Sequence, residues 1–130
     1  MCPVYINRIA SIHAESSNEK PYFSAQEPDY KEMITNANLR RRMSRMIKMG
    51  VACGLECLKD IPPEKVDAII TATGLGCLAD TEKFMNALMD NREQMLNPTA
   101  FIQSTFNTVG AQLALLLKIH AYNVTYVHRG

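Results

Sequence analysis

The alternation of apolar and polar residues divides the first half of the chain into a strand, a long loop and a helix. Residues 3–14, PVYINRIASIHA, carry β-branched and aromatic side chains in partial alternation, which predicts an outer or irregular strand. Residues 15–38 hold two prolines and mixed charge without periodicity. We expect a loop or arm there, with a short helical turn over 29–34. From 39 to 58 apolar residues recur every three or four positions, which predicts an amphipathic helix capped by Asn38.

The second half of the chain alternates strands and helices. Residues 64–73 contain the nearly continuous apolar run VDAIITAT, which predicts a strand buried on both faces. A helix is expected over 80–96, capped by Asp80 or Thr81 and stopped at Asn97-Pro98, and a last strand over 123–127. This order predicts an α/β fold with a mostly parallel sheet covered by helices.

The segment 107–119 is predicted to be a buried helix, with Asn107 as its N-cap. After Asn107 only Gln112 interrupts its apolar residues before Lys118, so every face of the helix is apolar and is expected to be buried. It is shorter than the about 20 residues that cross a bilayer. A chain of 130 residues has little material to enclose such a helix, and Gly50 and Gly54 on the preceding helix indicate close approach to another element. We therefore expect this chain to be part of a longer protein or of an oligomer that associates through residues 107–119.

Composition excludes several classes of function. The chain is 47% apolar and 21% charged with a net charge of +1, which is typical of a globular domain without general attraction to nucleic acid or membrane. Four cysteines, Cys2, Cys53, Cys57 and Cys77, match no zinc spacing, and the N-terminus does not resemble a signal peptide. We expect reduced thiols in the cytoplasm, no metal or cofactor, and neither nucleic acid nor membrane as partner.

Three local features of the sequence are candidates for binding or catalysis. The basic residues of the helix could bind a nucleic-acid phosphate or a carrier's pantetheine arm, but a solvated helix face fits them better: Arg40, Arg41, Arg42, Arg45 and Lys48. The loop 73–76 lacks the third glycine and the lysine of phosphate-binding loops, so we interpret it as a tight turn where α/β proteins bind ligands. Cys77 lies near a helix start that would stabilise a thiolate, yet no histidine is spaced to serve as its base.

The order of three segments, RRMSRMIKMGVACGLECL, VDAIITATGLGCLADTEKFMNAL and NPTAFIQSTFNTVGAQLALLLKIHAYNVTYV, resembles the N-terminal half of a β-ketoacyl synthase of the thiolase fold. The resemblance covers most of residues 39–130 and is closest to ketosynthase-like proteins of bacterial fatty acid, aryl polyene and pigment clusters. It implies that residues 1–130 form a single incomplete domain with a partial thiolase-like α/β fold.

The resemblance also implies a reaction that this chain lacks the residues to perform. The family condenses an acyl group with a malonyl-carrier thioester, using a cysteine just after the strand that corresponds to residues 124–127 and two histidines from the C-terminal half. Here Gly130 falls at or beside the cysteine position, and Cys77, His120 and His128 do not match the family's catalytic residues. We therefore assign no catalytic residue and expect no catalysis by this chain alone.

By the same resemblance, residues Phe101, Gln103, Phe106 and Asn107 border the acyl pocket or a subunit interface. The implied partners are an acyl carrier protein and a second subunit, in a homodimer or a ketosynthase heterodimer. Three functions stay open: the N-terminal part of a 3-oxoacyl-carrier-protein synthase of fatty acid, polyketide or aryl polyene biosynthesis, a non-catalytic partner subunit similar to a chain length factor, and a small α/β module that binds an anionic partner.

Overall fold

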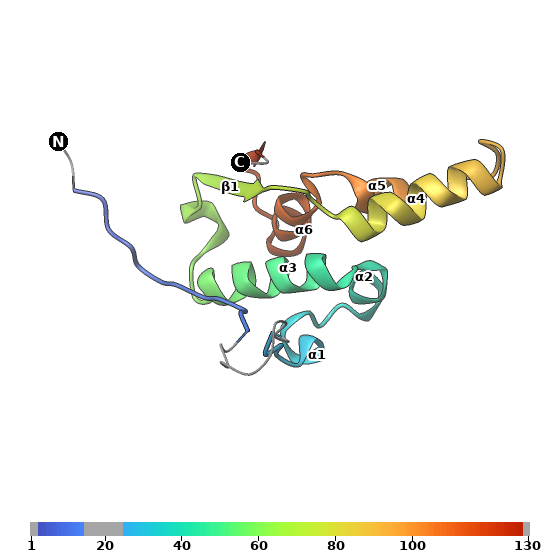
Figure 1. Cartoon of the computed structure of the whole chain (residues 1–130). Coiled ribbons are helices and arrows are strands. Elements are labelled where there is room, and N and C mark those ends of the chain that lie inside the picture. The colour runs from blue at the N-terminus through green and yellow to red at the C-terminus, as the bar shows by residue number, and fades with distance from the viewer. Residues whose placement is uncertain (1–2, 15–24, 129–130) are drawn as a thin grey trace.

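The computed structural model describes residues 3–14 and 25–128 (Figure 1). Cys2, Gly130 and the first part of the predicted loop, residues 15–24, lie outside the described residues. The elements follow one another as α1 (Tyr30–Met33), α2 (Ala37–Arg42), α3 (Arg45–Cys57), a 3-10 turn (Pro63–Lys65), β1 (Ala68–Thr73), α4 (Leu78–Asp90), α5 (Pro98–Ser104), α6 (Thr108–Leu117) and β2 (Tyr122–Val127).

The two strands form a parallel sheet, which confirms the α/β prediction. Their register runs from Ala68 opposite Tyr122 to Thr73 opposite Val127. One face of the sheet points toward α6, because the side-chain amide of Asn123 donates a 3.0 Å hydrogen bond to the carbonyl of Gly110. Since side chains alternate along a strand, this inner face also carries Ile69, which is buried.

The core lies where α3 crosses α6 beneath the inner face of the sheet. A Cβ placed on Gly50 would lie 2.8 Å from a methyl group of Val109, and one placed on Gly54 would lie 2.5 Å from a methyl group of Leu113. The two glycines therefore let α6 approach α3 closely, as their spacing predicted. The buried apolar residues are Ile34, Met43, Ile47, Val51, Ala52, Ile69, Cys77, Leu113 and Ile119.

The predicted strand over residues 3–14 is wrong. Residues 3–13 form an extended arm that passes α3 and projects away from the rest of the molecule toward its N-terminal end (Figure 1), and only Ala14 makes an isolated antiparallel bridge, to Ala25. Arg8 fastens the arm by donating to the carbonyls of Glu56 (3.3 Å) and Lys59 (2.6 Å) near the end of α3. A strand requires a paired neighbour as well as β-branched side chains, and no neighbouring strand lies beside the arm in the described residues.

The predicted helix over residues 39–58 is two helices. The chain is extended at Met43 (ψ 131°) and Ser44 (ψ 171°), which separates α2 from α3. Met43 is buried at this break, as its place in the apolar stripe predicted, so the periodicity of burial continues across a backbone that is not helical. The cap is also two residues earlier than predicted, because the side chain of Asn36, and not that of Asn38, accepts the first backbone N–H groups of α2.

Replacing Asn36 with alanine is expected to lower the free energy of unfolding by about 1 kcal/mol. Its side-chain oxygen accepts hydrogen bonds from the backbone nitrogens of Asn38 and Leu39, both at 3.1 Å. The matched control is Asn38→Ala, an exposed change expected to stay within about 0.5 kcal/mol of the parent. Urea denaturation of both variants measures the difference, and an equal loss in the two would refute this assignment of the cap.

The predicted helix over residues 80–96 is shorter, and a further helix follows it. α4 ends at Asp90 and begins after Cys77, and Asn97 accepts a hydrogen bond from Thr99 to cap α5, with Pro98 in its first turn. The predicted stop at Asn97-Pro98 is therefore wrong: these residues begin α5, because proline favours the first turn of a helix. α4 and α5 lie side by side at one end of the molecule (Figure 1) and pack through Phe84 and Phe101, whose ring centroids are 5.5 Å apart.

α6 is the predicted buried helix, with Asn107 in the N-cap position but without a side-chain capping bond. The described chain alone does not cover every face of this helix, because Leu115 is 61% exposed. Association through residues 107–119 stays a prediction. The outer face of the sheet is also open, with Ile70 65% exposed. The solvent-accessible area of 10102 Å² exceeds the roughly 6,900 Å² expected for a compact protein of 14.6 kDa.

No single helix within residues 3–14 and 25–128 is long and apolar enough to cross a membrane. α5 and α6 together reach the required length and composition, with a bend of 107° between them.

Candidate ligand cavity at the ends of the strands

A cavity of about 360 Å³ lies between α3, α6 and the carboxyl ends of the two strands. This volume is within the range of small-molecule sites, and open α/β sheets bind ligands at the carboxyl ends of their strands. The lining is mostly apolar and consists of Met46, Gly50, Gly54, Thr71, Ala72, Thr73, Gly76, Cys77, Phe106, Val109, Leu113 and Thr125.

The hydroxyl groups that line the cavity are engaged with the protein itself. Thr71 and Thr125 lie opposite each other on β1 and β2, and their hydroxyls share a hydrogen bond of 2.6 Å. The hydroxyl of Thr73 accepts a 2.9 Å hydrogen bond from the backbone nitrogen of Gly76. Because these hydroxyls already have hydrogen-bond partners, an apolar ligand in the cavity would leave few polar groups unsatisfied.

The loop 74–77 forms one wall of the cavity and depends on a glycine. Gly76 has φ +64°, a backbone conformation that other residues rarely adopt. A Cβ at this position would also lie 2.3 Å from Cδ1 of Phe106. The ring of Phe106 therefore rests directly on the backbone of Gly76, and this contact joins the loop after β1 to the start of α6.

Cys77 lies in this wall but does not have the properties of a nucleophile. It is 3% exposed, and burial together with the neighbouring carboxylate of Asp80 raises the pKa of its thiol. The expected stabilisation of a thiolate at the start of α4 is therefore wrong, since the loss of solvation outweighs the helix terminus. No histidine lines the cavity among the described residues, so no base is positioned for Cys77.

The four residues named from the resemblance are placed differently by the structure. Phe106 lines the cavity, and Asn107 precedes α6 next to it. Phe101 lies on α5 against Phe84 and is exposed on its other side. Gln103 is buried, and its side-chain oxygen has no hydrogen-bond partner in the described part of the chain. The cavity thus includes one of the four residues, and their role in acyl binding stays a prediction.

Sequence reasoning missed Met46 and the threonine pair that face the same cavity. Met46 follows the apolar stripe of α3, so it was counted as a core position, although it is exposed beside the cavity. Thr71 and Thr125 each lie two residues after an inward-facing residue of the same strand, Ile69 and Asn123, so they share the inner face of the sheet. This two-residue alternation in the sequence was the signal that could have identified them.

Part of the basic run stabilises the protein itself. The guanidinium of Arg40 donates to the carbonyl of Ile34, and that of Arg45 pairs with the carboxylate of Glu27. Arg41 and Arg42 are exposed on α2. Two of the five basic residues are therefore accounted for by contacts within the chain, which weakens the interpretation of the run as a dedicated anion site.

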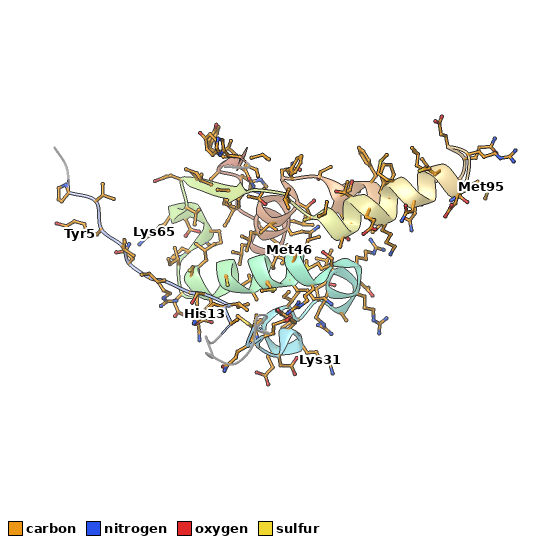
Figure 2. All side chains as sticks on the ribbon, viewed as in Figure 1. Tyr5, His13, Lys31, Met46, Lys65 and Met95 are labelled. Atoms are coloured by element: carbon orange, nitrogen blue, oxygen red, sulfur yellow. The ribbon has the colours of Figure 1, made fainter. Side chains whose placement is uncertain are left out.

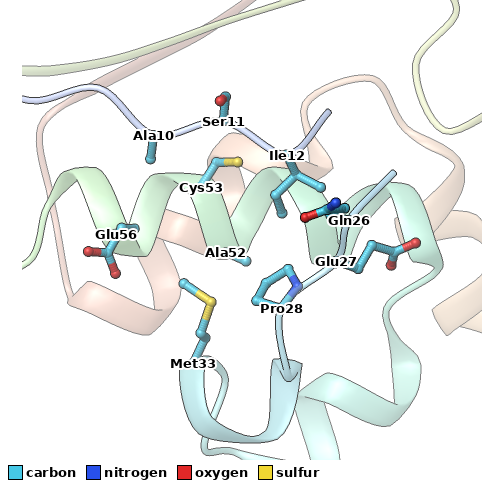
Figure 3. A pocket seen from close by; sticks show the side chains of 10 residues that line it. All are labelled: Ala10, Ser11, Ile12, Gln26, Glu27, Pro28, Met33, Ala52, Cys53 and Glu56. Carbon is cyan, nitrogen blue, oxygen red and sulfur yellow. The ribbon is translucent and has the colours of Figure 1, made fainter. Parts of the chain in front are cut away.

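A second cavity of about 450 Å³ lies between the arm, α1 and α3 (Figure 3). Hydrogen bonds from Tyr30 and Arg45 lower the pKa of Glu27 in its wall, and burial raises the pKa of the Cys53 thiol. Glu27 is thus held by neighbouring side chains, and Cys53 is kept as a neutral thiol. Its ten lining residues are Ala10, Ser11, Ile12, Gln26, Glu27, Pro28, Met33, Ala52, Cys53 and Glu56.

Of these two cavities, we regard the one at the strand ends as the candidate functional site, because α/β proteins bind ligands at the carboxyl ends of their strands.

These features define an α/β protein with a parallel sheet and an apolar cavity at the carboxyl ends of its strands. The model of the family "Beta-ketoacyl synthase, N-terminal domain" matches residues 13–125, and the chain belongs to this family. A solved structure of the ketosynthase ApeO in complex with its chain length factor ApeC, from Xenorhabdus doucetiae, contains a similar chain. That similarity has 25% sequence identity and a TM-score of 0.62 and covers 83% of this chain, which supports a ketosynthase thiolase-like fold.

The chain matches only 41% of the similar chain in that complex. No protein with curated annotation matches the sequence.

Proposed function

We propose that this chain is the N-terminal part of a 3-oxoacyl-carrier-protein synthase-like protein and supplies an apolar wall for the acyl chain. The observation that carries the proposal is the cavity of about 360 Å³ lined by Phe106, Val109 and Leu113. An unbranched acyl chain requires an apolar, water-poor site of this kind. Membership of the β-ketoacyl synthase family and the similarity to the ketosynthase complex support the assignment.

The proposed role is binding and assembly without condensation by this chain alone. Acyl transfer requires an activated nucleophile, and the buried thiol of Cys77 is not one. Gly130, predicted to stand at or beside the nucleophile position, lies outside the described residues. The remaining chemistry would come from the rest of the synthase of which this chain is the N-terminal part, with a carrier protein delivering acyl groups of fatty acid, polyketide or aryl polyene biosynthesis.

Titration with dansyl-labelled undecanoic acid tests the binding role. Replacing Val109 with phenylalanine fills part of the cavity, so we expect the dissociation constant to rise about tenfold, which is about 1.4 kcal/mol. The matched control is Val127→Phe, because Val127 is exposed and does not line the cavity. Equal affinities for the parent and Val109→Phe would show that the probe does not bind in this cavity, which would contradict the proposed binding role.

The purified chain is expected to form no 3-oxoacyl product from an acyl donor and malonyl-carrier protein. The reason is that the cysteines described by the structure are buried or half-buried, and no histidine lines the cavity of Cys77 or that of Cys53 among the described residues. Mass spectrometry of the carrier-bound products, with an active ketosynthase as positive control, is the measurement. Product formed by this chain alone would show that it holds a complete condensing site.

A second candidate is a non-catalytic partner subunit of the chain-length-factor kind. The observation that favours it is the relative's solved structure, in which a ketosynthase is found in complex with its chain length factor. Mixing this chain with a ketosynthase subunit and measuring molar mass by light scattering separates the candidates. A stable heterodimer supports the partner subunit, whereas failure to associate counts against it.

A further inference from the structure

The cavity of about 450 Å³ between the arm, α1 and α3 lies on the side of α3 that faces away from α6. Gly54 faces Leu113 of α6, whereas Glu56, which lines this cavity, follows two residues later, a rotation of about 200° around the helix. Figure 2 shows the same division, with Met46 on the side of α6 and His13 of the arm on the opposite side of α3. A ligand in this cavity is therefore separated from the candidate acyl site by the width of α3.

The walls of this cavity are fastened to one another by bonds within the chain. The backbone nitrogen of Gln26 donates a 3.2 Å hydrogen bond to the carbonyl of His13, which joins the arm to the segment before α1. That segment is attached to α3 by the ion pair between Glu27 and Arg45. At the end of α1, Ile34 is 1% exposed and belongs to the core. The cavity is therefore formed before any ligand arrives, as is usual for small-molecule sites.

The lining of this cavity combines apolar side chains with negative charge. Ile12 of the arm, Pro28 and Met33 supply apolar surface, and Glu27 and Glu56 lie at its two ends (Figure 3). None of the described residues that line the cavity is basic. A cavity lined by charges of one sign attracts ligands of the opposite sign. The lining therefore favours a cation over an anion.

Glu56 is the carboxylate that is available to a ligand. The two oxygens of Glu27 already accept hydrogen bonds, one from the hydroxyl of Tyr30 at 2.6 Å and one from the guanidinium of Arg45. The side chain of Glu56 is exposed, and its carboxylate forms no hydrogen bond or ion pair with the residues of 3–14 and 25–128. A positive group at this end of the cavity thus gains an ion pair without breaking an existing one.

We propose that this cavity is a second binding site, which takes a small organic ammonium ion with an apolar body. The ammonium group pairs with the carboxylate of Glu56, and the apolar body lies against Met33, Pro28 and Ile12. The volume of about 450 Å³ suits a ligand of this size. A fatty acid is disfavoured here, because its carboxylate is repelled by the same charge that attracts the amine.

Fluorescence titration with dansylcadaverine, a primary amine on an apolar linker, tests the charge recognition. Glu56→Gln is expected to raise the dissociation constant about threefold to fivefold, the scale of a partly exposed ion pair. Binding by the parent should also weaken as salt is added, because exposed charges are screened. The matched control is Glu32→Gln, which removes an exposed carboxylate of α1 outside the cavity and is expected to keep the parent affinity.

A variant that fills the cavity tests the location independently of charge. Ala10→Phe adds a ring to the lining from the arm and is expected to raise the dissociation constant for dansylcadaverine about tenfold. The matched control is Ile9→Phe, because Ile9 is the neighbouring residue, is 78% exposed and does not line the cavity. Thermal unfolding of each variant verifies that a changed affinity comes from a folded protein.

Three results would overturn the amine site. They are the absence of dansylcadaverine binding by the parent, equal affinities of the parent and Glu56→Gln, and binding that is lost in Val109→Phe but kept in Ala10→Phe. The last result would place the amine in the cavity at the strand ends. None of them affects the proposed acyl-binding role, because that role is tested with an anionic probe on the other side of α3.

Discussion

Replacing Ile47 with alanine is expected to lower the free energy of unfolding by about 2–5 kcal/mol. Ile47 is 0% exposed and lies in the core cluster with Val51, Leu113 and Ile34. Removing its methyl and methylene groups loses their transfer energy and leaves a cavity that neighbouring residues refill only partly. For a domain at the low end of the typical range, about 5 kcal/mol, the larger of these losses brings the chain near the unfolding threshold.

The adjacent position supplies the control for this prediction. Met46→Ala removes a side chain of similar size from a site that is largely exposed, so the expected loss is below about 1 kcal/mol. Chemical denaturation of both variants gives the comparison. A loss at Ile47 no larger than that at Met46 would mean that α3 does not face the core as described.

The type of each central element could be predicted from the sequence, because its signal is local. The apolar run over 66–73 has the length and β-branched content of a strand, and β1 is found there. The glycine spacing on α3 correctly predicted close approach to another element, since only a missing side chain allows that contact. Boundaries were less accurate, because the backbone leaves the helical conformation at Met43 although the apolar periodicity continues there.

The parts that failed depend on contacts far apart in the chain. Residues 3–13 have strand-like side chains, but a strand forms only when another strand presents its backbone groups, and β1 pairs with β2 instead. The state of Cys77 likewise depends on tertiary burial, which its position before α4 did not reveal. Of the candidate site, Phe106 and the loop at Gly76 could be found from the sequence, whereas the contribution of Met46 required the structure.

Substituting valine for Gly54 is expected to destabilise the chain by about 1–3 kcal/mol, the cost of inserting carbon atoms into a packed core. A Cβ at this position lies 2.5 Å and 2.6 Å from the two methyl groups of Leu113 and 3.1 Å from its Cγ. Both methyl groups of Leu113 must move to make room for the new side chain. Leu113 is itself buried, so little free space is available for that movement.

A double-mutant cycle with Leu113→Ala isolates this contact. Leu113→Ala alone should cost about 2–5 kcal/mol, yet it provides the space that valine at position 54 requires. The loss of stability in the double variant should therefore be smaller than the sum of the two single losses by about 0.5–3 kcal/mol. Gly74→Val is the control, since the nearest atom to a Cβ there is a backbone oxygen at 3.5 Å, an ordinary contact. Strictly additive losses in the cycle would show that residues 54 and 113 are not in contact. The close packing of α3 against α6 that forms the cavity wall would then be wrong.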